Sequence, residues 1–203
     1  MGKKTVSFLV SGRGSNFSNV AKKIISGDIN AFLGIVLSDK REARALDIAR
    51  DFGMKAYFVD PNAYQSRALH DRAMVDLLKK NKTDLVVAAG YMRILSPDFI
   101  HAFKNAIINI HPALLPSFPG VNGQKQAYDY GVKISGCTTH FIDEGTDTGP
   151  IIMQAAVDLR QDEKLEELSA RILMEEHRIL PESVKLFCDG KLRVKERKVF
   201  IKR

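Results

Sequence analysis

The chain has 203 residues, of which 45% are hydrophobic and 27% charged, and this balance is typical of a soluble globular protein with one buried core. Its apolar runs are too short to cross a membrane, no secretory leader is recognisable, and two cysteines, Cys137 and Cys188, are too few for a disulfide framework. The net charge of +7 does not indicate nucleic-acid binding, because residues 191–203 hold seven basic side chains and one acidic side chain. We therefore expect a cytoplasmic protein without nucleic-acid or membrane partners.

The first half of the chain alternates apolar runs with amphipathic stretches. The runs at 5–10, 32–37, 56–59, 84–89 and 106–110 predict strands, and those at 16–26, 42–52, 64–80 and 97–102 predict helices. Nearly continuous apolar strands indicate a sheet that is buried on both faces, which is typical of parallel strands. The pattern predicts an α/β fold with a doubly wound, mostly parallel sheet and with ligands at the carboxyl ends of its strands.

After Pro112 the pattern changes. A stretch rich in proline and glycine at 112–120 leads to a predicted helix at 124–130, and strands at 134–141 and 151–159 follow as a C-terminal antiparallel extension. A long helix is predicted from residue 162, and Pro181 is expected to kink it or end it early. The alternation in 191–203 predicts a basic strand at the edge of the sheet. No linker or repeat interrupts residues 1–203, which we interpret as a single domain.

A glycine-containing segment follows the first predicted strand and opens the first helix. Its sequence is Ser-Gly-Arg-Gly-Ser-Asn at residues 11–16. Glycines allow the backbone to approach a phosphate, and the N–H groups at a helix start point toward an anion. The alternative is a simple turn between strand and helix with a capping residue. The segment has neither a third glycine nor a Walker lysine, so by itself it leaves both interpretations open.

Asn109 and His111 lie two residues apart at the end of an apolar run, and strand geometry places them on the same side. An amide donor beside an imidazole suits acyl transfer, because the amide can stabilise an oxyanion while the imidazole handles a proton. The alternative is a strand-capping asparagine beside a half-buried histidine. Of the other histidines, His70 and His101 are expected on the surface, and His140 and His177 have no evident partner in sequence.

Asp147 lies in a predicted loop between two strands, within the sequence Gly-Thr-Asp-Thr-Gly-Pro at residues 145–150. Such a loop can expose a carboxylate at the rim of a site. More often, an aspartate in such a sequence only stabilises the turn, and the local sequence does not exclude this role for Asp147.

Four segments occur together in this order: residues 11–16, 90–97 (Gly-Tyr-Met-Arg-Ile-Leu-Ser-Pro), 109–116 (Asn-Ile-His-Pro-Ala-Leu-Leu-Pro) and 147–152 (Asp-Thr-Gly-Pro-Ile-Ile). With them the whole chain closely resembles the phosphoribosylglycinamide formyltransferases. The resemblance implies a Rossmann-like formyltransferase domain that transfers a formyl group from 10-formyltetrahydrofolate, without a metal, to the amine of glycinamide ribonucleotide in purine biosynthesis. It implies small-molecule substrates and either a monomer or a homodimer.

The resemblance also assigns residues. It implies the catalytic residues Asn109, His111 and Asp147, with Asp147 raising the pKa of the His111 imidazole. Substrate-binding residues would be Gly14, Ser15, Asn16 and Glu176. Residues that bind the folate would be Arg67, Met92, Arg93, Ile94, Leu95 and Asn109. Leu115 and Pro116 correspond to a cis peptide. Residues 119–127 look less like the family's loop, and no contacts are assigned to them.

Alternatives with related chemistry are a formyltetrahydrofolate hydrolase, or a formyltransferase with another amine acceptor such as aminoacyl-tRNA. The hydrolases usually carry an N-terminal regulatory domain, for which the first strand at residue 5 leaves no room, and the tRNA enzymes usually add a C-terminal nucleic-acid-binding domain. A non-enzymatic nucleotide-binding module would explain the glycine-containing segment alone.

Overall fold

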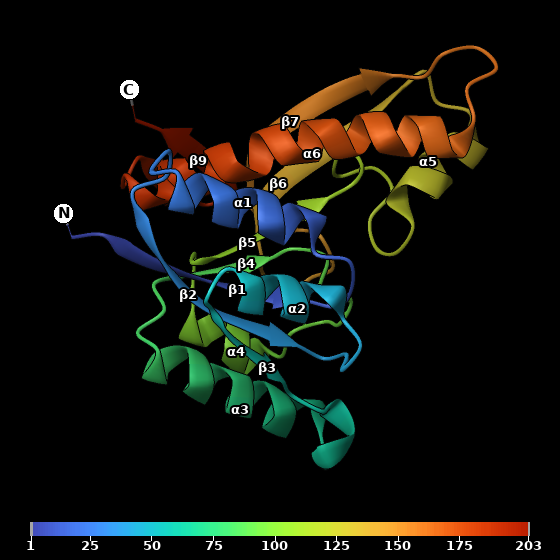
Figure 1. Cartoon of the computed structure of the whole chain (residues 1–203). Coiled ribbons are helices and arrows are strands. Elements are labelled where there is room, and N and C mark those ends of the chain that lie inside the picture. Colours follow the sequence, from blue (N-terminus) through green and yellow to red (C-terminus); the bar gives the residue numbers. More distant parts are fainter. Residues whose placement is uncertain (1, 203) are drawn as a thin grey trace.

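A computed structural model describes residues 2–202 of the chain. Its strands form one sheet, and their bounds are β1 Lys4–Val10, β2 Ala31–Ser38, β3 Lys55–Phe58, β4 Leu85–Ala88, β5 Ile107–His111, β6 Ile134–Phe141, β7 Ile151–Asp158, β8 Leu192–Lys195 and β9 Lys198–Ile201. The nine strands have the order β3-β2-β1-β4-β5-β6-β7-β9-β8 (Figure 1). Strands β1 to β5 pair in parallel, whereas β6 is antiparallel to both β5 and β7. The predicted parallel sheet and its antiparallel extension are confirmed.

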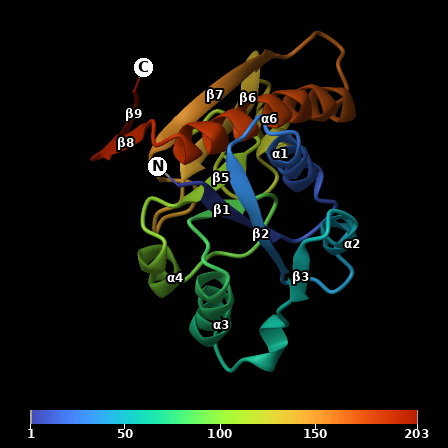
Figure 2. The same ribbon diagram turned by 60° about the vertical axis from the view of Figure 1, so that its left-hand side comes forward.

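Helices cover both faces of the sheet (Figures 1 and 2). Their bounds are α1 Ser15–Ile25, α2 Arg44–Asp51, a short 3-10 turn η1 Pro61–Ala63, α3 Arg67–Lys80, α4 Pro97–Ala102, α5 Gly123–Tyr130 and α6 Leu165–Cys188. The apolar side chains of α1, α2 and α6 pack with Phe8 and Val87 in one buried cluster. Those of α3 and α4 pack with Leu9 and Val86 in a second cluster. Neighbouring residues of a strand therefore enter opposite layers, as the pleat requires.

One of the two outcomes expected at Pro181, an early end of the helix, is wrong, because α6 continues to Cys188. Pro181 removes one helical hydrogen bond. Buried Ile179, Leu180 and Val184 flank it on both sides, and their packing against the sheet holds the helix together. His70 was expected on the surface, yet it is fully buried in α3.

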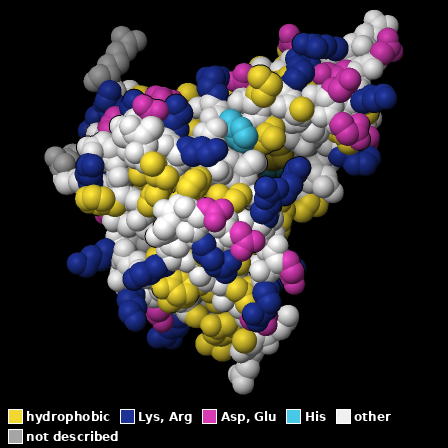
Figure 3. Space-filling model, viewed as in Figure 1, with side chains coloured by type: hydrophobic (Ala, Val, Ile, Leu, Met, Phe, Trp, Pro, Cys, Tyr) yellow, Lys and Arg dark blue, Asp and Glu magenta, His cyan; other side chains and the backbone are white. Residues whose placement is uncertain are grey.

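The basic C-terminal residues form the hairpin β8–β9 at the edge of the sheet, as expected. Lysine and arginine side chains are scattered among acidic ones over the face in Figure 3 rather than gathered in one stripe. The two cysteines are buried and unpaired. No helix in residues 2–202 is both long enough and apolar enough to cross a membrane.

Candidate active site

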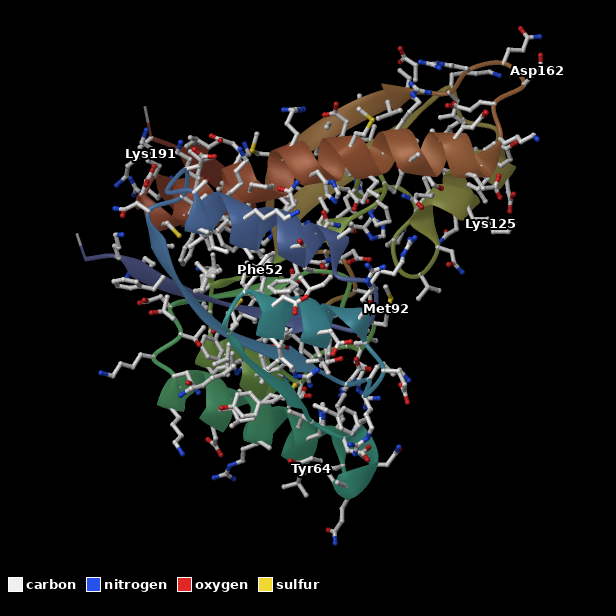
Figure 4. All side chains as sticks on the ribbon, in the orientation of Figure 1. Phe52, Tyr64, Met92, Lys125, Asp162 and Lys191 are labelled. Atoms are coloured by element: carbon white, nitrogen blue, oxygen red, sulfur yellow. The ribbon has the colours of Figure 1, made fainter. Side chains whose placement is uncertain are left out.

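A cavity of about 230 Å³ lies where β4 and β5 end. Its walls come from residues 90–95 after β4, from Asn109 to Pro112 at the end of β5, from residues 120–122 before α5, and from residues 142–147 after β6. The carboxyl ends of neighbouring parallel strands meet at this edge, which is where an open α/β sheet binds its ligands. Met92, at this edge on the right of Figure 4, projects from the loop after β4.

Asn109 and His111 both line the cavity from β5. Strand β6 pairs antiparallel with β5 in a register that sets His140 directly opposite Asn109. The Asn109 amide donates to His140 Nε2 over 3.1 Å. His140 Nδ1 lies 2.9 Å from the Phe141 carbonyl and must donate to it, which leaves Nε2 as the acceptor. His140 thus belongs to the site, although the sequence offered no partner for it.

Asp147 reaches the same cavity from the loop between β6 and β7. Its Oδ2 accepts a hydrogen bond from the Gly120 N–H at 2.7 Å and lies 3.3 Å from His111 Nδ1. Its Oδ1 lies 3.5 Å from the Asn109 amide nitrogen. The turn-forming role falls to Asp143 instead, whose Oδ1 accepts from the Gly145 N–H and the Thr148 hydroxyl. The Asp147 carboxylate therefore faces the site rather than its own turn.

Residues 118–123 hold both His111 and Asp147, although the sequence assigned no contacts to most of this segment. His111 Nε2 donates to the Phe118 carbonyl at 2.8 Å, and Gly120 supplies the N–H that binds Asp147. Phe118 and Asn122 adopt left-handed φ values of 55° and 59°. A Cβ on Gly123 would lie 3.0 Å from His111 Nε2, so only glycine fits there without displacement. No side-chain motif encodes these backbone contacts, which explains why sequence reasoning missed them.

Burial lowers the pKa of His111, and this effect outweighs the opposite effect of the Asp147 carboxylate and of the hydrogen bond to Phe118. The expectation that Asp147 favours the charged ring has the right sign, but the overall shift is downward. Burial raises the pKa of Asp147, but the neighbouring His140 ring and the Gly120 N–H lower it by a larger amount. The pKa of Asp147 therefore lies below its ordinary value. At neutral pH the site therefore pairs an ionised carboxylate with a neutral imidazole.

A second group of residues joins the start of α1 to the middle of α6. Gly14 has a φ of 76° and caps α1, and a Cβ there would lie 2.6 Å from Ala45 Cβ. Ser15 is the first residue of α1. Asn16 donates from its amide nitrogen to Glu176 of α6 over 2.6 Å, and its own Oδ1 is buried without a partner. Burial raises the pKa of Glu176, while the Asn16 hydrogen bond lowers it.

None of these four residues lines the cavity. They nevertheless lie at the same edge of the sheet, because the Ser11 N–H donates to the Gly90 carbonyl at 3.1 Å. Strand β1 pairs in parallel with β4, and the loops that follow the two strands are therefore neighbours. The glycine-containing segment and the wall at 90–95 thus form adjacent parts of one edge.

Five of the six residues predicted to bind the folate line the cavity, and one does not. Met92, Arg93, Ile94, Leu95 and Asn109 all line the cavity. Arg93 Nε is buried without a hydrogen-bond partner, which leaves a donor for a ligand. Arg67, at the start of α3, is exposed and does not line the cavity. Residues 2–202 contain no group of three or more His, Cys, Asp or Glu side chains arranged to hold a metal.

Comparisons with known proteins identify the family of the chain. Residues 4–184 match the formyl transferase family. The chain is 35% identical over 182 residues to a phosphoribosylglycinamide formyltransferase of Bacillus subtilis, covering 90% of this chain and 93% of that one. It is also 35% identical to the Escherichia coli protein of that name, over 93% of this chain and 89% of that one.

A solved structure, glycinamide ribonucleotide transformylase 1 from Symbiobacterium toebii, superposes with a TM-score of 0.97. It is 43% identical in sequence, and the match covers 99% of this chain and 95% of that one. The matches span nearly the whole length of both partners, so they concern the complete fold rather than a shared segment. The chain therefore belongs to the formyl transferase family and, within it, to the phosphoribosylglycinamide formyltransferases.

Proposed function

We propose that the protein transfers a formyl group from 10-formyltetrahydrofolate to the amine of glycinamide ribonucleotide, a step of purine biosynthesis. The observation that carries the proposal is the convergence of Asn109, His111 and Asp147 on one cavity at the sheet edge. The convergence suits formyl transfer, and the relatives are named for this reaction. A hydrolase is not favoured by them.

The residues that line the cavity support the formyl donor as its ligand. Its rim carries the exposed apolar side chains of Met92 and Ile94, and Leu95 lies buried beneath them. An apolar wall with a few polar groups is typical of a site for an aromatic ligand. Arg93 would supply its free Nε hydrogen. We retain Arg67 only as a contact for a part of the donor that extends beyond the cavity.

The bound donor supplies the formyl carbon that the amine attacks, and the chain's residues handle the charge and the proton that result. Asn109 donates hydrogen bonds from its amide to the developing oxyanion. Its longer contact, 3.5 Å to Asp147, is the one it can exchange for the ligand. One such donor is typically worth about 3–4 kcal/mol in the transition state.

His111 can take up a proton at Nδ1 during the reaction. The Phe118 carbonyl fixes the hydrogen on Nε2, so Nδ1 is the nitrogen that gains a proton on the side of Asp147. Burial keeps the pKa of His111 low in the free protein. Negative charge that develops beside the ring favours its charged form, and Asp147 stabilises the ring in that form. Asp147 accepts, through a water molecule, the proton that leaves the amine. When the bond between the formyl carbon and the donor nitrogen breaks, that nitrogen takes up one proton, so the proton count balances.

The second group of residues binds the ribonucleotide. Gly14 and Ser15 present the start of α1 to its phosphate, where backbone N–H groups point toward an anion. Asn16 and Glu176 contact the remainder of the ribonucleotide, and the buried Asn16 Oδ1 is available to accept a hydrogen bond from it. We further propose that the protein works in the cytoplasm, because both of its cysteines are unpaired thiols.

An acceptor competition tests the proposal. Donor labelled in its formyl group is mixed with the protein and with glycinamide ribonucleotide, aminoacyl-tRNA or water alone as the acceptor. We expect rapid labelling of the ribonucleotide and only slow release of labelled formate without it. The Asn109→Ala and His111→Ala variants should lose the transfer. Rapid formate release that the ribonucleotide does not alter would instead support the hydrolase.

A further inference from the structure

We propose that Ser11 and Asp71 are positioning residues that fix the wall of the donor cavity from its two ends. The wall is the segment 92–96, which we call the donor wall. This inference rests on the proposed function, because it assumes that the cavity holds the formyl donor. Neither residue lines the cavity, so each would act through the main chain of the donor wall.

Residues 92–95 of the donor wall belong to no helix or strand, and Ser96 caps α4 by accepting the N–H groups of Phe99 and Ile100. Its first residue, Met92, is 70% exposed, and Ile94 in its middle is 57% exposed, so packing does little to hold these side chains. Two backbone N–H groups tie the wall to the rest of the protein. The Met92 N–H donates to Ser11 Oγ at 2.9 Å, and the Ser96 N–H donates to Asp71 Oδ2 at 2.6 Å.

Asp71 is a rigid anchor because it is buried and both of its carboxylate oxygens have polar neighbours. Its Oδ1 lies 3.2 Å from His70 Nδ1, and His70 Nε2 donates to the Val59 carbonyl at 3.1 Å, so a hydrogen bond from Nδ1 to Asp71 requires a hydrogen on both ring nitrogens. Both side chains are almost completely buried in α3. A buried carboxylate requires such partners, since a charge without them is costly to bury. The Ser96 N–H is one of those partners, and its bond to a charged acceptor is stronger than a bond to a neutral one.

Ser11 connects the other end of the donor wall, at Met92, to the glycine-containing segment. Its hydroxyl donates to Asp39 Oδ1 at 2.6 Å, which turns its lone pairs toward the Met92 N–H. Its own N–H donates to the Gly90 carbonyl. Three residues further on, Gly14 opens the helix that we propose binds the phosphate of the acceptor. One hydroxyl therefore links the wall of the donor cavity to the loop for the other substrate.

Two consequences follow from this arrangement. Loss of either anchor should loosen the donor wall and weaken donor binding, while the phosphate loop itself stays formed. Loss of the Ser11 hydroxyl should in addition uncouple the two sites, so that the ribonucleotide no longer strengthens donor binding. Such coupling is reciprocal, and it can be measured from either ligand.

The first test removes the Asp71 anchor in two steps. Asp71→Ala deletes the acceptor of the Ser96 N–H, whereas Asp71→Asn keeps an oxygen there without the charge. We expect the Kd of a deazafolate that cannot donate its formyl group to rise about tenfold in Asp71→Ala and less in Asp71→Asn. The Kd of the ribonucleotide should change less than about twofold in both.

Asp84→Ala is the matched control for Asp71. It also removes a carboxylate that accepts a backbone N–H, from Thr5 at 2.8 Å, but it lies outside the cavity. Amide exchange of Ser96 should accelerate in the Asp71 variants and not in the control. If folded Asp71→Ala binds the deazafolate as the control does, the positioning role of Asp71 is wrong and the residue only stabilises the fold.

The second test measures coupling in Ser11→Ala. Ser7→Ala is its matched control, because the buried Ser7 hydroxyl also accepts a backbone N–H, from Ile35 at 3.1 Å, and bonds a second side chain, Thr83. We expect the deazafolate Kd to rise about tenfold in Ser11→Ala alone. We expect the ribonucleotide to lower the deazafolate Kd in the wild type and to leave it unchanged in Ser11→Ala.

The possible failures are distinguishable. A wild-type protein that binds no deazafolate would contradict the proposed function and the inference together. If the wild type binds it and both Ser11→Ala and Asp71→Ala leave its Kd within about twofold, only the inference is overturned. Amide exchange at Met92 and Ser96 reports the anchoring bonds without any ligand, so unchanged exchange in the folded variants would also overturn it.

Discussion

Asp147 Oδ2 lies 3.3 Å from His111 Nδ1, on the side of the ring opposite the Phe118 carbonyl. The neutral ring presents a lone pair to the carboxylate, and the charged ring presents a hydrogen. The contact therefore favours protonation at Nδ1, while burial of the ring opposes it. The balance of these two effects makes His111 able to gain and release a proton during the reaction.

Asp147→Asn removes the charge of this side chain and keeps its size. We expect the pKa of His111 to fall below its already lowered value, because the favourable charge is gone while burial remains. Turnover should fall by at least about 100-fold, the scale of a lost proton-transfer group. Both ligands should still bind. Titration of the His111 ring by NMR, beside the pH–rate profile, measures both effects.

Two results would change this account of Asp147. Identical titration of His111 with near-normal turnover in Asp147→Asn would return the residue to a structural role in its loop. Unchanged titration with lost turnover would leave Asp147 as the residue that positions the water molecule.

The low pKa of His111 also predicts how stability depends on pH. Between that lowered value and about 6.5, the unfolded chain binds a proton that the folded chain does not. The neutral His111 ring therefore makes its full contribution to the free energy of unfolding above about pH 7, and this contribution decreases as the pH falls through the interval. Urea unfolding of the wild type and of His111→Gln should show the wild type losing more stability on acidification from about pH 8 to 5.5. A constant difference between the two proteins would contradict the lowered pKa.

Ser15→Ala should weaken binding of the ribonucleotide and leave donor affinity nearly unchanged, because Ser15 lies at the start of α1 and not in the cavity. Gly14→Val should weaken it more, but the Cβ would collide with Ala45 and disturb the fold as well. Ser15→Ala is therefore the cleaner variant. Calorimetry with the ribonucleotide and its dephosphorylated form measures the effect. Equal affinity for the two forms in the wild type would exclude a phosphate site at this loop.

Removal of residues 191–203 should reduce stability or solubility more than it affects chemistry. The hairpin β8–β9 completes the edge of the sheet beside β7 and carries most of the net charge. It also touches the loop of Asp147, because Arg197 donates to the Thr148 carbonyl at 2.9 Å. Arg197→Ala should therefore lower turnover only slightly, which a steady-state assay can measure. Specific loss of donor binding in a folded truncated protein would place the hairpin in the site.

The predictable part of the fold was the part encoded by local periodicity. Apolar runs marked β1 to β7 to within about two residues, and the nearly continuous apolar runs among β1 to β5 indicated the parallel pairing of those strands. Pro181 showed the limit of local rules, because tertiary packing of its neighbours holds a helix that the residue itself disfavours. His70 showed the same limit for polarity, since the fold brings the Val59 carbonyl to it and buries it together with its neighbour Asp71.

The candidate site divides in the same way. The spacing of Asn109 and His111 indicated that they lie together on one side of a strand, whereas their catalytic role, like that of Asp147, depended on the family resemblance. His140 was missed because its position opposite Asn109 depends on the register of β5 with β6. Phe118 and Gly120 act through backbone atoms, which residue types do not reveal.

The most direct test of the account is a crystal structure with glycinamide ribonucleotide and a non-reactive formyl donor bound together. We predict the phosphate at the start of α1 and the donor ring against residues 92–95. The amine and the formyl carbon should lie about 3–3.5 Å apart. The formyl oxygen should be within hydrogen-bonding distance of the Asn109 amide and the His111 ring. A formyl group bound away from Asn109 and His111, with the two ligands in separate sites, would contradict the central claim.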